Sequence, residues 1–232
     1  MISLLKKLVA IFLPFRCHVC SHDTDFSVVL CANCRNRLRQ ILAKPFPVLD
    51  TCCEFPVYTL SSYDSFVSDV IRIIKYHPSY RLLKILADEC EQTEALRALI
   101  RPDDVLIPVP MHPARLAERG FNQADYLAGR FAARCGCHYS PALVRVRATR
   151  PQADCNECER LTNLEQAFAL DSGLARSAFP GRRLLLIDDV ATTGTTLQRC
   201  GEVLKPLAPG EICALTVSHS FRRTAKPAKK AS

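Results

Sequence analysis

The stretch from Leu184 to Thr196 constrains the fold of this chain most, because its residues predict a strand, a polar turn and the start of a helix in that order. Four bulky apolar residues, Leu184 to Ile187, predict a buried strand. Asp188 and Asp189 follow at the point where we expect that strand to end. A turn rich in Thr and Gly comes next, and apolar residues at helical spacing follow it. The pattern therefore predicts a buried strand that leads directly into a helix N-terminus.

This turn has the chemistry of a sugar phosphate site. Backbone N–H groups at a helix start lack partners and lie at the positive end of the helix dipole, so they attract a phosphate. Gly194 permits a close backbone approach. Asp188 and Asp189 are acceptors suited to vicinal sugar hydroxyls or to a hydrated Mg²⁺. Four threonines supply hydroxyl donors: Thr192, Thr193, Thr195 and Thr196. Together these groups describe a site for a ribose 5-phosphate; the alternative is a strand end with two solvated acids and an ordinary turn.

Strands and helices alternate along the rest of the chain and predict an α/β domain with a parallel sheet flanked by helices. Residues 45–56 predict a linker. We expect strands at 57–60, 105–107, 143–146, 183–187 and 212–217, and helices from 64 to about 78, over 80–100 and up to Gly136. Residues 147–160 are polar and long enough to form a flap, with Arg150 and Gln152 in it.

A basic, amide-rich loop follows the predicted strand at 105–107. In open parallel sheets ligands bind outside the carboxyl ends of the strands, so this loop should lie at the same edge as the turn after Ile187. Arg115, Arg119 and Asn122 in the loop suit a pyrophosphate. The alternative is an ordinary charged entry to a surface helix.

Cys17, Cys20, Cys31 and Cys34 form two Cys-x-x-Cys pairs near the start of the chain. In a reducing compartment this spacing predicts a closed tetrahedral site for structural Zn²⁺, with disulfides or an iron–sulfur cluster as the alternatives. A segment this short cannot stabilise itself by apolar burial, so the metal would supply much of its folding free energy. The other cysteines predict no second metal site; they include the adjacent Cys52 and Cys53, and Cys155 and Cys158.

Length and charge narrow the class of protein further. The 232 residues suffice for a cysteine module over 1–50, a main domain over 51–220 and a basic, disordered tail over 221–232. The net charge of +8 suits nucleic acid, although a solvated tail explains part of it. Aromatic residues make up 7% and Trp is absent, which indicates no large base-stacking platform. The apolar run at 8–15 is too short to span a bilayer, so we expect no membrane span and a cytoplasmic protein with reduced thiols.

With its apolar strand, two acids and T-T-G-T turn, the chain resembles the type I phosphoribosyltransferases. The resemblance implies that Asp188 and Asp189 hold the ribose hydroxyls of phosphoribosyl pyrophosphate (PRPP), which binds with Mg²⁺. It also implies that the turn from Thr192 to Thr196 cradles the 5-phosphate. Arg119 and Asn122 would then bind the departing pyrophosphate.

A wider set of motifs resembles the ComF family, which includes the GntX-like proteins. The set comprises the N-terminal Cys-x-x-Cys pair, Ile74-Lys75-Tyr76, Ile107-Pro108-Val109-Pro110, Arg119-Gly120-Phe121-Asn122-Gln123, Gln152, Arg160-x-x-Asn163, Ala167-Phe168 and the acid–TTGTT turn. The resemblance implies a zinc-ribbon-like N-terminus joined to a phosphoribosyltransferase-like domain. It also implies an association with competence, as handling of imported single-stranded DNA or use of DNA as a nutrient.

Three functions compete on this reading. The first is an enzyme, a phosphoribosyltransferase that uses PRPP. The second is a non-catalytic accessory protein that binds PRPP, a nucleotide or a DNA 5′-phosphate and contacts single-stranded DNA or a competence helicase. The third is a scaffold in which the zinc module mediates oligomerisation. No residue pattern identifies an acceptor substrate or fixes the oligomeric state.

Overall fold

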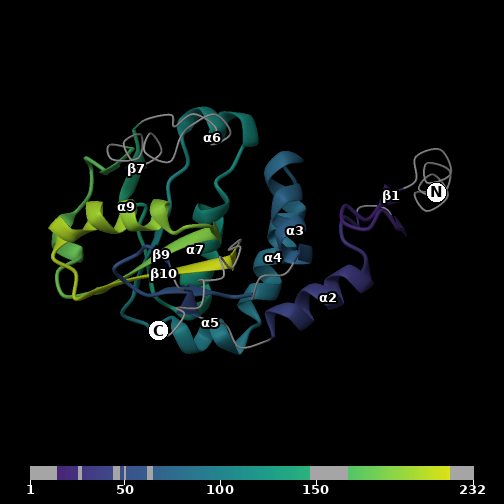
Figure 1. Ribbon diagram of the computed structural model, residues 1–232, viewed down its shortest axis with the longest axis horizontal. Coiled ribbons are helices and arrows are strands. Elements are labelled where there is room, and N and C mark those ends of the chain that lie inside the picture. Colours follow the sequence, from purple (N-terminus) through teal and green to yellow (C-terminus); the bar gives the residue numbers. More distant parts are fainter. Residues whose placement is uncertain are drawn as a thin grey trace, which may run out of the picture.

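The centre of the protein is a six-stranded sheet with the strand order β3-β4-β10-β9-β5-β6 (Figure 1). The computed structural model describes residues 15–25, 28–43, 48–49, 51–61, 65–146 and 167–219. The strands are β3 (Val48–Leu49), β4 (Val57–Thr59), β5 (Val105–Pro108), β6 (His138–Tyr139), β9 (Arg183–Ala191) and β10 (Glu211–His219). All run parallel except β3, which pairs antiparallel with β4. The predicted α/β class with a parallel sheet is confirmed.

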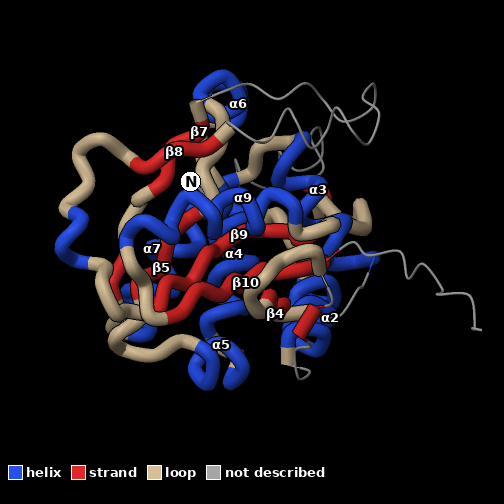
Figure 2. The backbone as a smooth tube through the Cα atoms, turned by 60° about the vertical axis from the view of Figure 1, so that its left-hand side comes forward, coloured by secondary structure: helices blue, strands red, loops and turns tan. Residues whose placement is uncertain are grey.

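Helices surround this sheet, and Figure 2 shows β5, β9 and β10 as its central strands. The α-helices are α2 (Ala32–Leu42), α3 (Ser65–Tyr76), α4 (Tyr80–Glu91), α5 (Glu94–Leu99), α6 (Pro113–Arg119), α7 (Gln123–Cys135) and α9 (Thr195–Leu204). Two small antiparallel pairs stand apart from the sheet: β1 (Phe15–Arg16) with β2 (Asp23–Thr24), and β7 (Leu143–Arg145) with β8 (Phe168–Leu170). In the part of the chain that the structure describes, none of these helices has the length and apolar character to cross a membrane.

The alternation of side chains along β9 divides the core into two layers. Successive residues of a strand point to opposite faces of its sheet. Leu185 and Ile187 belong to a core shared with α2, α3, α4 and α7. Leu184 and Leu186 belong to a second core shared with α9 and the β7–β8 pair. All four leucine and isoleucine side chains are buried, which explains the continuous apolar run in the sequence.

Two expected helical regions differ in detail from the sequence reading. Residues 80–100 form two helices rather than one, because the Thr93 hydroxyl accepts the Leu96 N–H at 3.2 Å and starts α5 anew. The loop after Pro110 contains α6, which ends at Gly120 with φ of +80°. A residue with positive φ ends a helix at little cost only when it is glycine.

Two expected extended regions also differ. The strand predicted at 143–146 forms β7, which lies outside the main sheet, and β6 takes the sheet edge instead. The predicted linker at 45–56 contains β3, and its later part packs on α9. The predictions for the apolar run at 8–14, for Arg150, Gln152, Cys155 and Cys158, and for the tail at 221–232 lie outside the described residues.

Candidate functional site

The strand β9 does not end at Ile187, as the sequence predicted, but continues to Ala191. Its pairing with β5 stops at Ile187, whereas its pairing with β10 continues to Ala191 opposite His219. Pairing with the equally long β10 therefore keeps the last residues of β9 extended. Among the residues that the structure describes, Asp188 and Asp189 consequently have a neighbouring strand on one side only.

The two acids point to opposite faces of the sheet, as successive strand residues must. Asp189 is 6% exposed, and its Oδ1 accepts a hydrogen bond from Lys75 Nζ of α3 at 2.7 Å. Asp188 lies on the α9 side, where its charge contributes to a raised pKa of the buried thiol of Cys200 in α9, after burial itself. The two carboxylates therefore lie on opposite faces of the sheet rather than side by side on one face.

The environment of Asp188 raises its pKa to about 7, chiefly through burial and then through the charge of Asp189. The positive charge of Lys75 acts in the opposite direction. Asp188 Oδ1 also accepts the backbone N–H of Asp189 at 2.8 Å. At a pH near 7 a substantial fraction of the Asp188 carboxyl groups is therefore protonated, whereas Asp189 is held in an ion pair with Lys75.

The turn after β9 presents the start of α9. Gly194 is the residue before the first helical position and has φ of +87°. Because glycine has no side chain, Gly194 supplies no capping oxygen to α9; the Thr193 hydroxyl accepts the Thr195 N–H at 3.4 Å instead. The Thr193 and Thr195 hydroxyls lie 2.7 Å apart, and Thr192 and Thr193 are exposed. An anion can therefore meet both hydroxyls and amides here.

Two predicted residues follow β5, and they differ in what they contact. Arg119 lies near Asp189, whereas Asn122 makes hydrogen bonds within its own loop. Arg119 Nη1 donates to Gln123 Oε1 at 3.0 Å, and burial lowers the Arg119 pKa while Asp189 and Tyr76 raise it. Asn122 instead caps α7: its Oδ1 accepts the Ala124 N–H, and its Nδ2 donates to the Val109 carbonyl, both at 3.1 Å. Asn122 therefore shapes the loop.

The four cysteines of the N-terminal module converge. The sulfurs of Cys17, Cys20, Cys31 and Cys34 all lie within 4.8 Å of one another, the only such cluster of potential metal ligands within the described ranges. Cys20 Sγ and Cys31 Sγ are 3.7 Å apart, close to the separation of about 3.8 Å that a tetrahedral site with Zn–S bonds of about 2.3 Å requires. Backbone N–H groups of Cys31 and Cys34 point at the sulfurs of Cys17 and Cys31 at 3.4 and 3.5 Å. The cluster is compatible with a structural zinc site.

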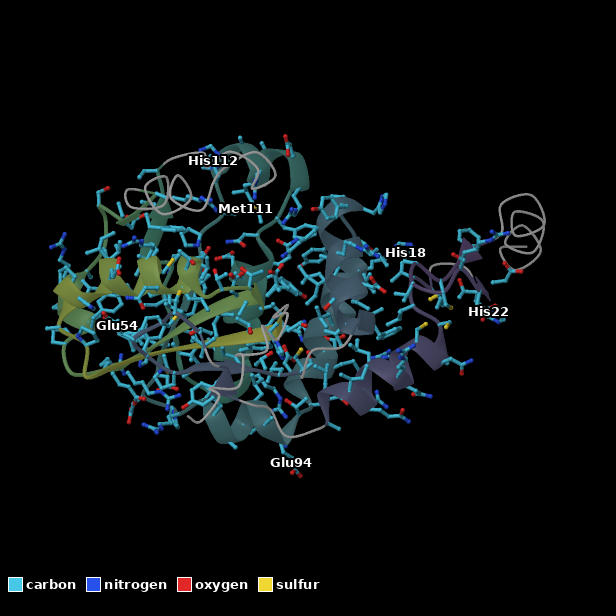
Figure 3. All side chains as sticks on the ribbon, in the orientation of Figure 1. His18, His22, Glu54, Glu94, Met111 and His112 are labelled. Carbon is cyan, nitrogen blue, oxygen red and sulfur yellow. The ribbon has the colours of Figure 1, made fainter. Side chains whose placement is uncertain are left out.

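None of the eleven described cysteines forms a disulfide. His18 and His22, labelled in Figure 3, lie in the same module, but the four sulfurs already complete a tetrahedral set. The module is joined to the main domain through α2. Arg35 Nε and Arg39 Nε donate to the two carboxylate oxygens of Glu89 in α4 at 2.6 and 2.8 Å, and the Glu89 side chain is fully buried.

Comparison with known proteins shows relatives over most of the chain, although no family model matches it. The chain is 28% identical to competence protein F of Haemophilus influenzae over 87% of its length and 95% of that protein. It is 30% identical to the DNA utilization protein YhgH of Shigella flexneri over 81% of its length and 83% of that protein. The chain belongs to the ComF family. Competence protein ComFC of Streptococcus pneumoniae matches at 28% over 79% of each chain.

Solved structures similar to this ComF family member include adenine phosphoribosyltransferases. The enzyme from Trypanosoma brucei matches with a TM-score of 0.38 and 10% identity over 87% of each chain. The enzyme from Leishmania tarentolae matches with a TM-score of 0.37 and 12% identity over 79% of this chain and 87% of that one. These values describe a distant likeness.

The sequence reading of this ComF family member missed three contributors to the site. Lys75 was noted only within the Ile-Lys-Tyr motif, yet it forms the ion pair with Asp189. Arg145 of β7 is half-buried, and Asp188 is among the charges that act on its pKa, which burial lowers. The sequence could have pointed to Arg145, because it is a charged residue among apolar residues of a predicted strand. The third contributor is the segment 51–55.

This segment, predicted as part of a linker, lies along the turn and α9. The Cys52 N–H donates to the Thr193 carbonyl at 3.2 Å, and Cys53 Sγ donates to the Gly194 carbonyl at 3.3 Å. The Glu54 N–H donates to Gln198 Oε1 in α9 at 2.9 Å, and Glu54 is labelled in Figure 3. Cys52 and Cys53, which had no predicted role, thus hold the turn in place from one side.

Proposed function

We propose that the chain binds a ribose 5-phosphate ligand, PRPP or a related phosphoribosyl compound, at the β9–α9 turn. The observation that carries this proposal is the glycine-started helix α9 with exposed threonine hydroxyls beside it, after a strand that carries two acids near its end. The 5-phosphate would take the first-turn amides together with the hydroxyls of Thr192, Thr193, Thr195 and Thr196. The ribose hydroxyls would bind the Asp188 carboxylate near the tip of β9. Asp189, on the other face of the sheet, would reach them by exchanging its hydrogen bond from Lys75 for the sugar.

We propose unequal roles for Arg119 and Asn122 toward the pyrophosphate. Arg119 is close enough to Asp189 for each charge to act on the other, so it suits a pyrophosphate that leaves the ribose. Asn122 acts by holding the loop, since both of its polar atoms are engaged. Mg²⁺ bound with PRPP would offset the charge that accumulates between the pyrophosphate and the two acids.

We place this activity in DNA uptake or DNA utilisation, on the names of the relatives. The chain would act as three parts: a cysteine module over 1–50, the phosphoribosyl-binding domain over 51–220 and a basic tail over 221–232. Structural Zn²⁺ would bind the sulfurs of Cys17, Cys20, Cys31 and Cys34. A transferase reaction follows if an acceptor attacks the ribose carbon that carries the pyrophosphate.

A calorimetric titration of the full chain with PRPP, with and without Mg²⁺, tests the proposal. We expect saturable binding that Mg²⁺ strengthens. Asp188→Asn removes the charged acceptor and should weaken binding at pH 8 by roughly tenfold, or about 1.4 kcal/mol. Asp69→Asn makes the same change in charge on the exposed surface of α3 and should leave binding as it is. Absence of PRPP binding under both conditions, or equal binding by Asp188→Asn, would overturn the proposal.

Turnover is tested separately. Release of pyrophosphate from PRPP in the presence of a panel of nucleobases would identify a transferase. The Asp188→Asn chain serves as the comparison, because pyrophosphate release that this variant retains in full cannot arise at the proposed site.

A further inference from the structure

Four aromatic side chains, which we call the aromatic group, lie close to the candidate site: Tyr76, Tyr80, Phe121 and Tyr126. Tyr76 is 74% exposed and Tyr80 is 52% exposed. The Tyr80 ring packs edge-on against Phe121 and Tyr126, with ring centroids 6.0 and 5.1 Å away. The low aromatic content of the sequence indicated no stacking platform, but the fold packs Tyr80 of α4 against one aromatic residue just before α7 and one within it.

Two members of the aromatic group, Tyr76 and Phe121, lie near Arg119, the arginine on which the charge of Asp189 acts. Tyr76 directly follows Lys75, whose Nζ lies 2.7 Å from Asp189 Oδ1. Tyr76 and Asp189 both raise the pKa of Arg119, against the effect of burial, so all three side chains share one neighbourhood. Phe121 lies two residues after Arg119, at the start of the segment that leads into α7.

A buried donor in this neighbourhood has no acceptor. Gln123 is 2% exposed, and its Oε1 accepts a hydrogen bond from Arg119. Its Nε2 finds no hydrogen-bond partner among the described residues. A buried donor without an acceptor destabilises a folded protein, and an oxygen of a ligand seated beside Arg119 would satisfy it after a small adjustment of the glutamine amide.

We propose that the aromatic group is the base-binding part of the β9–α9 site, so that the ligand is a nucleoside 5′-monophosphate with a carbonyl-bearing base such as uracil. This inference rests on the proposed function and adds a substrate class to it. The exposed tyrosine rings offer faces for stacking. A base carbonyl would meet the Gln123 amide, while the sugar phosphate lies between the tip of β9 and the start of α9.

A free nucleotide and the 5′-phosphorylated end of single-stranded DNA both present a base, a sugar and a 5′-phosphate. The exposure of Tyr76 leaves room for either source. Uridine 5′-monophosphate and a short 5′-phosphorylated oligothymidylate therefore serve as parallel probes, each compared with ribose 5-phosphate. An oligothymidylate of the same length without the 5′-phosphate completes the set.

Calorimetry on the full chain measures the contribution of the base. We expect uridine 5′-monophosphate, the phosphorylated strand or both to bind at least about tenfold more tightly than ribose 5-phosphate, the increment of a stacked base. The double variant Tyr76→Ala with Tyr80→Ala should remove this difference and leave ribose 5-phosphate binding unchanged. Tyr76→Phe with Tyr80→Phe keeps the rings and should keep the difference.

Failure of this inference is distinguishable from failure of the proposed function. Equal affinity for ribose 5-phosphate and both phosphorylated probes would overturn the base-binding role and leave the sugar phosphate site standing. A tenfold preference that the double alanine variant retains would also overturn it. A chain that binds neither ribose 5-phosphate nor PRPP would overturn the proposed function itself.

Discussion

The cysteine module and the β9–α9 site lie apart in the molecule, with β1 and α2 to the right of α3 in Figure 1 and β9 and α9 to its left. The module takes all four sulfurs from one short stretch, Cys17 to Cys34, and they converge as the spacing predicts. The β9–α9 site combines side chains from α3, the end of α6, β9 and the segment 51–55. A local motif carries its own geometry, whereas a site assembled from distant segments depends on the whole fold.

The largest effect should come from the module. Cys34→Ser removes one of four thiolates, and in small modules structural zinc supplies on the order of 10 kcal/mol of folding free energy. We expect the variant to lose its zinc and the amides of α2 to lose protection from hydrogen exchange, while β9 and β10 keep theirs. Cys135→Ser, outside the cluster, is the matched control. Full zinc content in Cys34→Ser would contradict the assignment.

The next effect concerns the ion-paired contact between α2, which follows the cysteine module, and α4. Glu89→Gln leaves Arg35 and Arg39 without their buried carboxylate and should lower the free energy of unfolding by about 2 kcal/mol, less than for a fully buried pair because both arginines are half-exposed. Denaturant unfolding measures the loss, and Asp69→Asn in an exposed pair should cost less than about 0.5 kcal/mol.

The same junction has a predictable pH dependence. Burial opposes ionisation of Glu89, but the hydrogen bonds from Arg39 and Arg35 outweigh it and lower its pKa. The stabilisation is therefore present above the unfolded-state pKa, about 4.3, and is lost on further acidification. The difference between wild type and Glu89→Gln should shrink as the pH falls below that value. A difference that stays constant down to strongly acidic pH would argue against the ion pair.

Alanine substitutions at two glycines test whether the backbone of the turn has the described conformation. One glycine lies in the turn, and the other lies inside a helix with open space around it. Gly194→Ala introduces a Cβ at φ of +87°, 2.9 Å from Thr51 Cβ, and should lower the free energy of unfolding by about 1–2 kcal/mol and weaken phosphate binding. The Cβ that Gly129→Ala adds in α7 has no other atom within 4 Å, so this variant should raise the free energy of unfolding by about 0.5 kcal/mol. Opposite signs in thermal unfolding are the expected outcome, and equal signs would show that the turn is not held as described.

The smallest effect concerns Asp188. Its pKa is raised to about 7, so the folded state binds more protons than the unfolded state between about pH 4 and 7. Its contribution is therefore most favourable at low pH and declines as the pH rises to 7. Asp188→Asn should be about 1 kcal/mol more stable than wild type at pH 8, a figure reduced for the partial exposure of this group, and less so at pH 5. Parallel stability profiles for the two chains would contradict the raised pKa.

Sequence reasoning predicted the parts of this molecule that local pattern controls. The buried run at 184–187, the helix expected from 64 to about 78 and the helix end at Gly136 all follow from periodicity and backbone freedom. The extent of β9 was wrong because a neighbouring strand, β10, sets it. The Lys75–Asp189 ion pair could not be read from spacing, since the two residues meet only when α3 packs on the sheet.

The one-sided tip of β9 has a consequence for how this protein tolerates change. From Asp188 to Ala191 this strand pairs with β10 on one side, and no described strand pairs with it on the other. Every amino acid has the main-chain N–H and C=O groups of that open side, so a ligand bound there through them would keep its contacts when neighbouring side chains are exchanged.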